Sequence, residues 1–267
     1  MGLLSNKIQK DDLKPGDHIY SWRNAYIYAH HGIYVSEDKV IHFTRGAGQE
    51  IGTGTILDRL LLSSSPVRSD TPCEKCGDNT RLDGVISSCL DCFLSGGDLY
   101  RFEYGVTSIF FLAKARGGTC TLACSDPPEK VLHRATHLLQ NGFGFYHAFR
   151  NNCEDFAIYC KTGLLVVTSL SVGRSGQAAS LLAAASAIVS SPLRFMTTSF
   201  SGLAVVAAGM YCIGRYVVDM GVRRDVIEIA VEDLVARSEV IRPEVVGVVP
   251  DEVLGRLHGS TQQLVAN

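Results

Sequence analysis

The stretch AHHGIYVSEDKVIHF, residues 29–43, contains two short runs of β-branched and aromatic residues separated by a polar turn. Such runs on either side of Ser36-Glu37-Asp38 predict a β-hairpin. Paired strands would bring His30 of the first run close to His42 of the second. The pattern therefore predicts an antiparallel sheet that carries two neighbouring imidazoles.

A second informative stretch lies far downstream. It reads Asn151-Asn152-Cys153-Glu154-Asp155-Phe156, and the apolar pattern continues to Gly163. Acidic residues in the first turn and a glycine stop predict a short helix that begins near Cys153. The thiol would then lie at the positive end of a helix dipole, which favours the thiolate.

Cys153, His30 and His42 together could supply the groups of a thiol nucleophile. Only the thiolate attacks, so a neighbouring imidazole must take the proton and a third group must orient that imidazole. His30 fits the base and His42 the orienting group. The alternative is that Cys153 is a small core residue. With nine cysteines and eight histidines in the chain, a Cys and His pair can also arise by chance.

Three motifs in this order resemble the lecithin:retinol acyltransferase (LRAT) family. They are the His-His-Gly-Ile-Tyr run from His30, the second histidine His42, and the Asn-Cys-Glu-x-Phe run at residues 152–156. Lys14-Pro15-Gly16-Asp17 resembles the start of the same domain. The resemblance covers residues 15–170. It implies an α+β fold, a permuted papain-like (NlpC/P60) domain whose antiparallel sheet carries both histidines and packs on the nucleophile helix.

The resemblance implies a role for each matching residue. Cys153 corresponds to the nucleophile that forms an acyl-thioester, His30 to the general base, and His42 to the third catalytic residue. Family members move acyl chains from phospholipids to an amine, an alcohol or water. The resemblance thus implies a thiol acyltransferase or phospholipase that needs no cofactor for catalysis.

Two positions depart from the family pattern. Asp155 stands where many relatives have histidine, and His31 stands where others have an aromatic residue. The departure at Asp155 leaves the substrate class open. Strand alternation would send His30 and His31 to opposite faces of the sheet, so only one of them can be the base. The family pattern selects His30.

Two C-x-x-C pairs lie between the histidine and cysteine motifs, and their members are Cys73, Cys76, Cys89 and Cys92. Two pairs can converge on one ion, and four thiolates fill a tetrahedral zinc site with no open position. We therefore predict a structural Zn²⁺ site in an insertion over residues 71–94. Unligated thiols or two disulfides are the alternatives. No secretory signal is recognisable, which argues against disulfides.

The paired knuckles narrow the resemblance to the plant branch of the LRAT-domain family. They also support a second functional class, a zinc-stabilised and catalytically silent adaptor that keeps the LRAT fold. Such an adaptor could respond to soft metals, which thiolates prefer. Retention of His30, His42 and Cys153 favours the enzyme, because a binding module has no physical need of all three.

Charge and composition exclude one class of partner. The 267-residue chain has a net charge of −2, and its Lys and Arg residues are scattered, so no basic stripe predicts nucleic-acid binding. The expected partners are a phospholipid or acyl-lipid substrate and a membrane surface. No protein partner can be inferred. Without a secretory signal, we expect a cytoplasmic protein that is not secreted.

The C-terminal third is rich in small apolar residues, especially over 175–218. Its charge-free part, 195–214, is about as long as the roughly 20 residues that span a bilayer. Its Ala and Gly content equally suits a buried helix or one in the membrane interface, so this segment could attach the protein to a membrane. We expect a helical extension over 171–258, with an amphipathic helix beyond Gly221, and a disordered tail at 259–267.

Overall fold

A computed structural model of the chain describes residues 6–23, 28–44, 73–77, 84–114, 116–144, 152–166 and 200–241. The chain divides into two compact units, Met1–Val235 and Ala236–Asn267. All of the features discussed below belong to the first unit, except the end of its last helix, which crosses the boundary. The disordered tail predicted at 259–267 and the apolar residues 175–199 lie outside the described residues.

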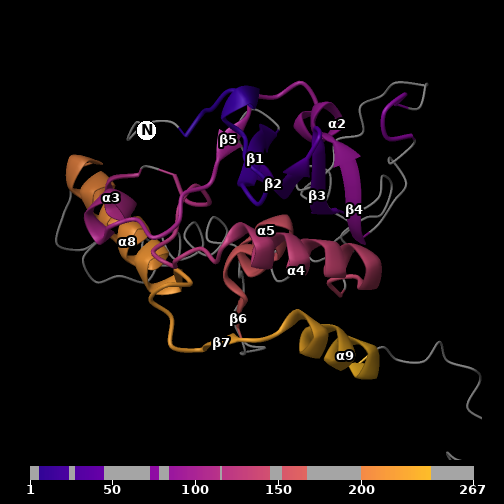
Figure 1. The fold of residues 1–267 in the computed structure, drawn as a ribbon. Helices are drawn as coiled ribbons and strands as arrows, with labels where there is room; N and C mark the ends of the chain where they lie inside the picture. The colour runs from indigo at the N-terminus through magenta and orange to yellow at the C-terminus, as the bar shows by residue number, and fades with distance from the viewer. Residues whose placement is uncertain are drawn as a thin grey trace, which may run out of the picture. The chain divides into compact units, whose positions relative to one another are not determined.

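A five-stranded antiparallel sheet forms the centre of the first unit (Figure 1). Its strand order is β4-β3-β2-β1-β5. The strands are β1 (His18–Arg23), β2 (Tyr28–Ser36), β3 (Lys39–Thr44), β4 (Gly84–Cys89) and β5 (Tyr100–Arg101). A short 3₁₀ helix, η1 (Lys10–Asp12), precedes the sheet.

The predicted hairpin is confirmed as β2 and β3. Its turn places Glu37 and Asp38 at φ angles of 48° and 61°. Two successive residues with positive φ form the turn whose twist matches that of the flanking strands. Gly32 of β2 lies directly opposite His42 of β3, so the hairpin register is the one that brings the two histidines to one face.

Helices α4 (Pro128–Asn141) and α5 (Cys153–Thr162) cover one face of the sheet (Figure 1). Their apolar residues form the main core with Ile33, Ile41 and Phe43. Because alternate residues of a strand share a face, Ala29 and His31 lie on the same side as Ile33. We call this the α5 face.

A short helix, α2 (Leu90–Leu94), covers the opposite face, and its apolar side chains pack on Ile19 and Val40. Gly32 lies under this helix. A Cβ atom at Gly32 would lie 2.8 Å from Val40 Cγ1 and 2.9 Å from Phe93 Cε2, so the close approach needs glycine. His30 shares the face of Gly32 by alternation. We call this the α2 face.

The predicted helix at Cys153 is also confirmed. The Asn152 side chain accepts hydrogen bonds from the backbone amides of Glu154 and Asp155, at 2.9 and 3.1 Å. The Asp155 carboxylate in turn accepts from the Asn152 amide at 3.3 Å, which completes a capping box. Gly163, with φ 71°, ends the helix. Asp155, one of the departures from the family pattern, therefore has a structural role.

The remaining elements lie after β5 and after α5. They are α3 (Ser108–Ala113), α8 (Phe200–Val218), α9 (Val231–Ile241), and a two-stranded sheet of β6 (Leu164–Val166) and β7 (Val226–Glu228). The prediction of an amphipathic helix beyond Gly221 is wrong in part. Val226 and Ile227 pair with the edge of β6, and their β-branched side chains suit that pairing. The helix begins only at Val231.

The prediction for the apolar C-terminal segment is tested by α8. This helix contains most of the charge-free part of the sequence. Within the part of the chain that the structure describes, no helix is both long and apolar enough to cross a membrane.

Candidate active site and metal centre

His30 and His42 form a buried imidazole pair on the α2 face. Nε2 of His30 lies 2.9 Å from Nδ1 of His42, and Nε2 of His42 lies 2.9 Å from Oγ of Ser88. Both rings contact Phe93 of α2, whose ring centroid lies 5.2 Å from that of His30 and 5.4 Å from that of His42. The three polar side chains come from β2, β3 and β4, so the sheet register fixes their alignment.

The donor and acceptor of each hydrogen bond in the row His30, His42 and Ser88 can be assigned. The Ser88 hydroxyl donates to the carbonyl oxygen of Cys89 at 3.3 Å, so its oxygen is left to accept from Nε2–H of His42. Nδ1 of a neutral His42 must then accept from Nε2–H of His30. This assignment leaves Nδ1 of His30 with a lone pair. That nitrogen is buried, with no hydrogen-bond partner among the described residues.

Burial keeps both imidazoles neutral at neutral pH. It lowers the pKa of His42 to about 3, with a smaller contribution from the Arg23 charge. Burial, followed by the charges of His42 and Arg23, also holds the pKa of His30 well below its ordinary value. A neutral imidazole with a free lone pair is the form that accepts a proton.

Cys153 lies at the N-terminus of α5, and its side chain is almost fully buried. Its Sγ lies 3.8 Å from the carbonyl oxygen of Ala29. Ala29 immediately precedes His30, so the structure brings the thiol beside the strand that carries the first histidine. Among the described residues, the pairing of β2 with β3 begins at Gly32 and His42 and continues to the turn. Ala29 and His30 therefore lie in the part of β2 before this pairing begins.

A second chain of buried rings lies on the α5 face. Nδ1 of His31 lies 2.9 Å from Nε2 of His18, and Nδ1 of His18 lies 2.7 Å from the Tyr104 hydroxyl. Phe102 stacks on His18 with centroids 4.4 Å apart. Burial lowers the pKa of His31 to about 3 and that of His18 well below its ordinary value. Sequence reasoning singled out His31 but missed His18, Tyr104 and, in the first chain, Ser88.

The direction of the second chain is the reverse of the first. A phenol is a better donor than an imidazole N–H, so we assign the Tyr104 hydroxyl as donor to His18. His18 then donates to Nδ1 of His31, which leaves Nε2 of His31 as an N–H group. Nε2 is likewise buried without a partner in the described part of the chain. The first chain thus ends in an acceptor and the second in a donor.

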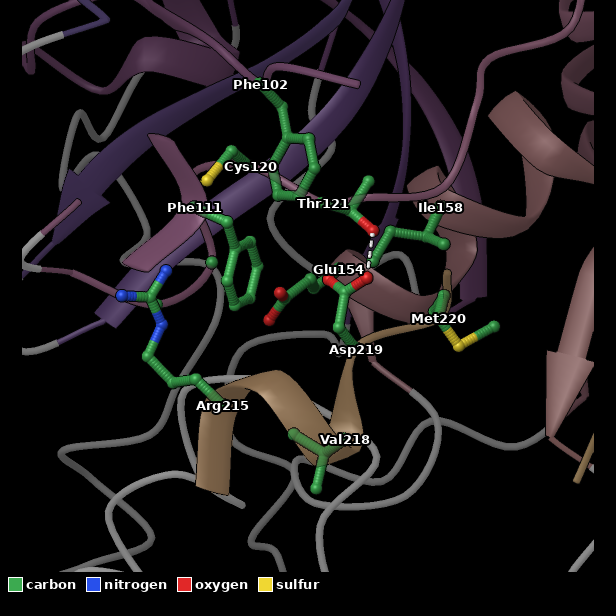
Figure 2. Close-up of a pocket in the computed structure, with 12 residues that line it drawn as sticks. Phe102, Phe111, Cys120, Thr121, Glu154, Ile158, Arg215, Val218, Asp219 and Met220 are labelled. Atoms are coloured by element: carbon green, nitrogen blue, oxygen red, sulfur yellow. Dashed lines mark hydrogen bonds between the residues drawn. The ribbon is translucent and has the colours of Figure 1, made fainter. Parts of the chain in front are cut away.

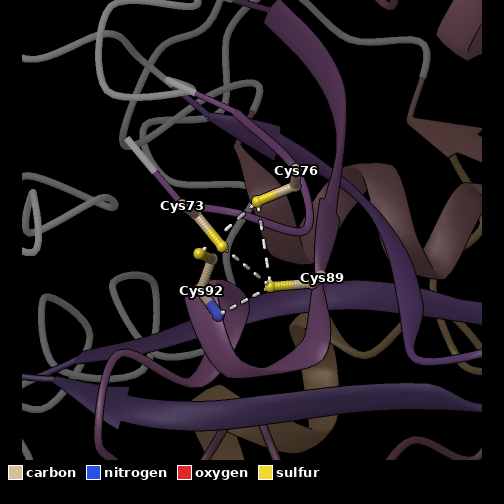
Figure 3. A group of neighbouring side chains, drawn as sticks. All are labelled: Cys73, Cys76, Cys89 and Cys92. Carbon is tan, nitrogen blue, oxygen red and sulfur yellow. Dashed lines mark hydrogen bonds between the residues drawn. The ribbon is translucent and has the colours of Figure 1, made fainter. Parts of the chain in front are cut away.

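The four predicted metal ligands lie together (Figure 3). All four sulfur atoms lie within 4.8 Å of one another. Cys76 Sγ lies 3.5 Å from Cys92 Sγ and 3.7 Å from Cys89 Sγ, and Cys73 Sγ lies 3.8 Å from Cys89 Sγ. Zn–S bonds of about 2.3 Å in a tetrahedron place sulfur atoms about 3.8 Å apart. The four thiols could therefore hold a metal ion, and they form no disulfide.

Each C-x-x-C pair has its own local structure. In the first, the amide and carbonyl of Cys73 and those of Gly77 exchange two hydrogen bonds, and Gly77 has φ 72°. The Lys75 and Cys76 amides lower the pKa of the Cys73 thiol to about 6, which favours its thiolate form. In the second, Cys89 ends β4 and caps α2, because its sulfur accepts from the Cys92 amide.

A pocket lies beside α5 (Figure 2). Glu154 and Ile158 of α5 form part of its wall, and most of the rest is apolar. Asp219, directly after α8, accepts hydrogen bonds from the Thr121 hydroxyl and the Leu122 amide, both at 3.1 Å. Burial raises the pKa of its carboxyl. Cys153 is not among the described residues that line this pocket.

Comparisons with known proteins agree with the motifs and the fold. The family described as Lecithin retinol acyltransferase matches residues 11–166, which is more than half of the chain. Protein LEAD-SENSITIVE 1 of Arabidopsis thaliana is 60% identical over 238 residues, covering 89% of this chain and 92% of that protein. The chain therefore belongs to the lecithin retinol acyltransferase family, and it has a plant relative of nearly the same extent.

Proposed function

We propose that this protein is a thiol acyltransferase or phospholipase that acts on glycerophospholipid acyl esters, with Cys153 as nucleophile and His30 as base. One observation carries the proposal. A buried thiol at a helix N-terminus lies beside β2, the strand that also carries His30, a neutral imidazole whose Nδ1 is left with a lone pair. Membership of the family supports the acyl chemistry.

The first half of the proposed reaction forms a thioester. Nδ1 of His30 takes the proton of Cys153, and the thiolate attacks the ester carbonyl carbon. The C–O bond to the glycerol then breaks, and the leaving oxygen takes the proton back from the His30 imidazolium. The products are an acyl-thioester on Cys153 and a lysophospholipid. The backbone amide of Cys153 is the default donor to the developing oxyanion.

The second half transfers the acyl group. An amine, an alcohol or water loses a proton to His30 as its nitrogen or oxygen attacks the thioester carbon. The C–S bond breaks, and Cys153 regains its proton from His30. In both halves His42 accepts a hydrogen bond from Nε2–H of His30, which orients the ring and stabilises the imidazolium.

His31 is the competing base, and one observation favours it. Alternation places His31 on the α5 face, the side of the sheet on which the Cys153 helix packs. The direction of its hydrogen-bond chain opposes this role, because Nε2 of His31 then carries a proton. We therefore assign the base to His30.

A direct assay tests the enzyme proposal. Purified protein is mixed with vesicles of fluorescent phosphatidylcholine, and fatty acid and acylated amine are measured against Cys153→Ser. We expect turnover by the wild type and none by the variant, with Cys124→Ser as the matched control at an exposed cysteine. Absence of wild-type turnover with every acceptor would favour the alternative, a catalytically silent, zinc-stabilised adaptor that could respond to metals.

We also propose that the four-cysteine site holds a structural Zn²⁺ ion. A set of four thiolates at tetrahedral spacing supports this choice, because it leaves no open position for a substrate or water. Metal analysis of the purified protein should find about one zinc per chain. Replacing Cys73 and Cys76 by Ser should remove it, whereas Cys124→Ser should not. Equal zinc in all three proteins would refute the site.

We further propose that the protein is cytoplasmic and visits membrane surfaces to reach its lipid substrate. Exposed apolar side chains on α3 and α8 support this, since Ile109 is 83% and Val205 is 72% exposed. Ile109→Glu should lower co-sedimentation with phosphatidylcholine vesicles while leaving hydrolysis of a soluble short-chain ester intact. Undiminished co-sedimentation would exclude α3 from the contact.

A further inference from the structure

We propose that the metal ion held by the four cysteines fixes the His30–His42 pair in its active arrangement. The inference rests on the proposed function, because it concerns the base of the same reaction. It assigns Ser88 and Phe93 as positioning residues, which act on the imidazoles and not on the substrate. Two connections between the metal site and the histidines support it.

The first connection runs along β4. Cys89 is a metal ligand in this account, and Ser88 directly precedes it. The Ser88 hydroxyl donates to the Cys89 carbonyl and lies 2.9 Å from Nε2 of His42. Fixing the backbone of Cys89 thus fixes the hydroxyl that determines the direction of the His42 hydrogen bonds. That direction leaves the lone pair on Nδ1 of His30.

The second connection runs through α2. Phe93 follows the ligand Cys92, is almost fully buried, and contacts both imidazoles with centroids 5.2 and 5.4 Å away. The Arg23 guanidinium also donates to the carbonyl oxygens of Phe93 and Leu94. Gly32 leaves the space that the Phe93 ring occupies. The ring therefore packs the histidines against the sheet.

The helix that carries Phe93 needs an anchor. α2 has five residues, and so short a helix is not stable by itself in water. In this account the ligands Cys89 and Cys92 at its start would tie it, through the ion, to the turn that carries Cys73 and Cys76. Loss of the ion would release both Phe93 and Ser88 from the histidine pair.

The first test breaks the hydrogen bond while leaving the ligands intact. Ser88→Ala and Ser88→Thr are compared at equal, full zinc content by the rate at which iodoacetamide labels Cys153, read by peptide mass spectrometry. Ser88→Ala should slow labelling about tenfold, the lower range for loss of a supporting group around a metal site. Ser88→Thr keeps the hydroxyl and should restore the rate. Equal rates in wild type and Ser88→Ala would overturn the inference.

The second test removes the ion from the wild-type protein. Exchange of the imidazole C2–H groups with deuterium is followed by mass spectrometry before chelation, after chelation and after Zn²⁺ is returned. Exchange at His30 and His42 should accelerate several-fold without the ion and recover with it. Exchange at the exposed His133 of α4 should not change, nor should amide exchange in α4. Unchanged exchange at His30 and His42 would contradict the coupling.

The second readout does not depend on catalysis, so the two proposals can fail separately. A protein without turnover, but with metal-dependent exchange at His30 and His42, would refute the proposed function and keep the coupling. A protein with turnover, but with histidine exchange and Cys153 labelling that do not depend on the ion, would keep the proposed function and refute the coupling. Should chelation unfold the protein, the Ser88 variants still test the connection between the metal site and His42 along β4, because they retain all four ligands.

Discussion

Nε2 of His30 lies 2.9 Å from Nδ1 of His42, and this contact leaves Nδ1 of His30 as the buried nitrogen that is free to take a proton. In the proposed reaction, the ring that orients the base is thus another imidazole, which contacts a serine from the next strand. A neutral orienting group stabilises an imidazolium less than a carboxylate would. It still fixes the ring and its tautomer.

Replacement of His42 tests this orienting role. His42→Leu removes the acceptor for Nε2–H of His30, so kcat for ester cleavage should fall by about 10² to 10⁴, the range of a general base contribution. His42→Gln can still offer its amide oxygen to His30 and should retain more activity. The comparison of kcat with KM is the measurement. Equal loss in both variants would show that the role of His42 is only packing.

The identity of the base is tested by His30→Gln and His31→Gln. Glutamine keeps polar atoms in each buried chain, but it cannot accept a proton at neutral pH. His30→Gln should abolish thiolate-dependent labelling of Cys153 at pH 7, with labelling recovered only at alkaline pH. His31→Gln should lower stability and leave the pH profile of labelling in place. The reverse result would transfer the role of base to His31 and its chain through His18 to Tyr104.

The buried histidines predict acid sensitivity of the fold. The folded-state pKa values of His31 and His42 are about 3, against an ordinary value of 6.5. Above pH 6.5 neither the folded nor the unfolded state binds these protons. Between pH 6.5 and 3 only the unfolded state does, so the free energy of unfolding falls as the pH falls. The slope is about 1.4 kcal/mol per pH unit for each such histidine.

Urea unfolding from pH 7.5 to 5 measures this slope. The stability should be nearly constant above pH 7 and fall progressively below pH 6.5. His31→Gln should reduce the slope by the contribution of one histidine. A flat profile in this window would mean that the buried imidazoles become protonated without cost in the folded protein.

Gly32→Ala tests the contact between the hairpin and α2. The added Cβ would lie 2.8 Å from Val40 and 2.9 Å from Phe93, and overpacking of this kind costs about 1–3 kcal/mol. Phe93→Leu in the same chain should recover part of the loss. Gly209→Ala is the matched control. Nothing lies within 4 Å of its added Cβ in α8, so it should not destabilise the protein. A neutral Gly32→Ala would show that α2 can move away freely.

The features that were predictable from sequence are the locally encoded ones. The β2–β3 hairpin follows from β-branched runs around a polar turn, and α5 follows from its acidic first turn and Gly163. The four-cysteine cluster follows from two C-x-x-C pairs, since each pair is a local unit. For the hairpin and the helix the signal lies within a few residues of the structure that it specifies, and the two Cys pairs are only twelve residues apart.

The features that sequence reasoning missed depend on partners far away along the chain. Ser88 becomes relevant only because β4 pairs with β3, and Tyr104 only because its hydroxyl reaches His18. Residues 226–228 form a strand because β6 offers an edge to pair with. No spacing rule within those segments contains this information.

In the proposed reaction Cys153 carries an acyl group during turnover, and this intermediate can be trapped. Wild-type protein is mixed with phosphatidylcholine of defined acyl chains, quenched in acid, digested and read by mass spectrometry. We expect one acyl group in thioester linkage on Cys153, lost on treatment with neutral hydroxylamine and absent from Cys153→Ser. No acyl adduct on Cys153, or the same adduct on another cysteine in both proteins, would contradict it.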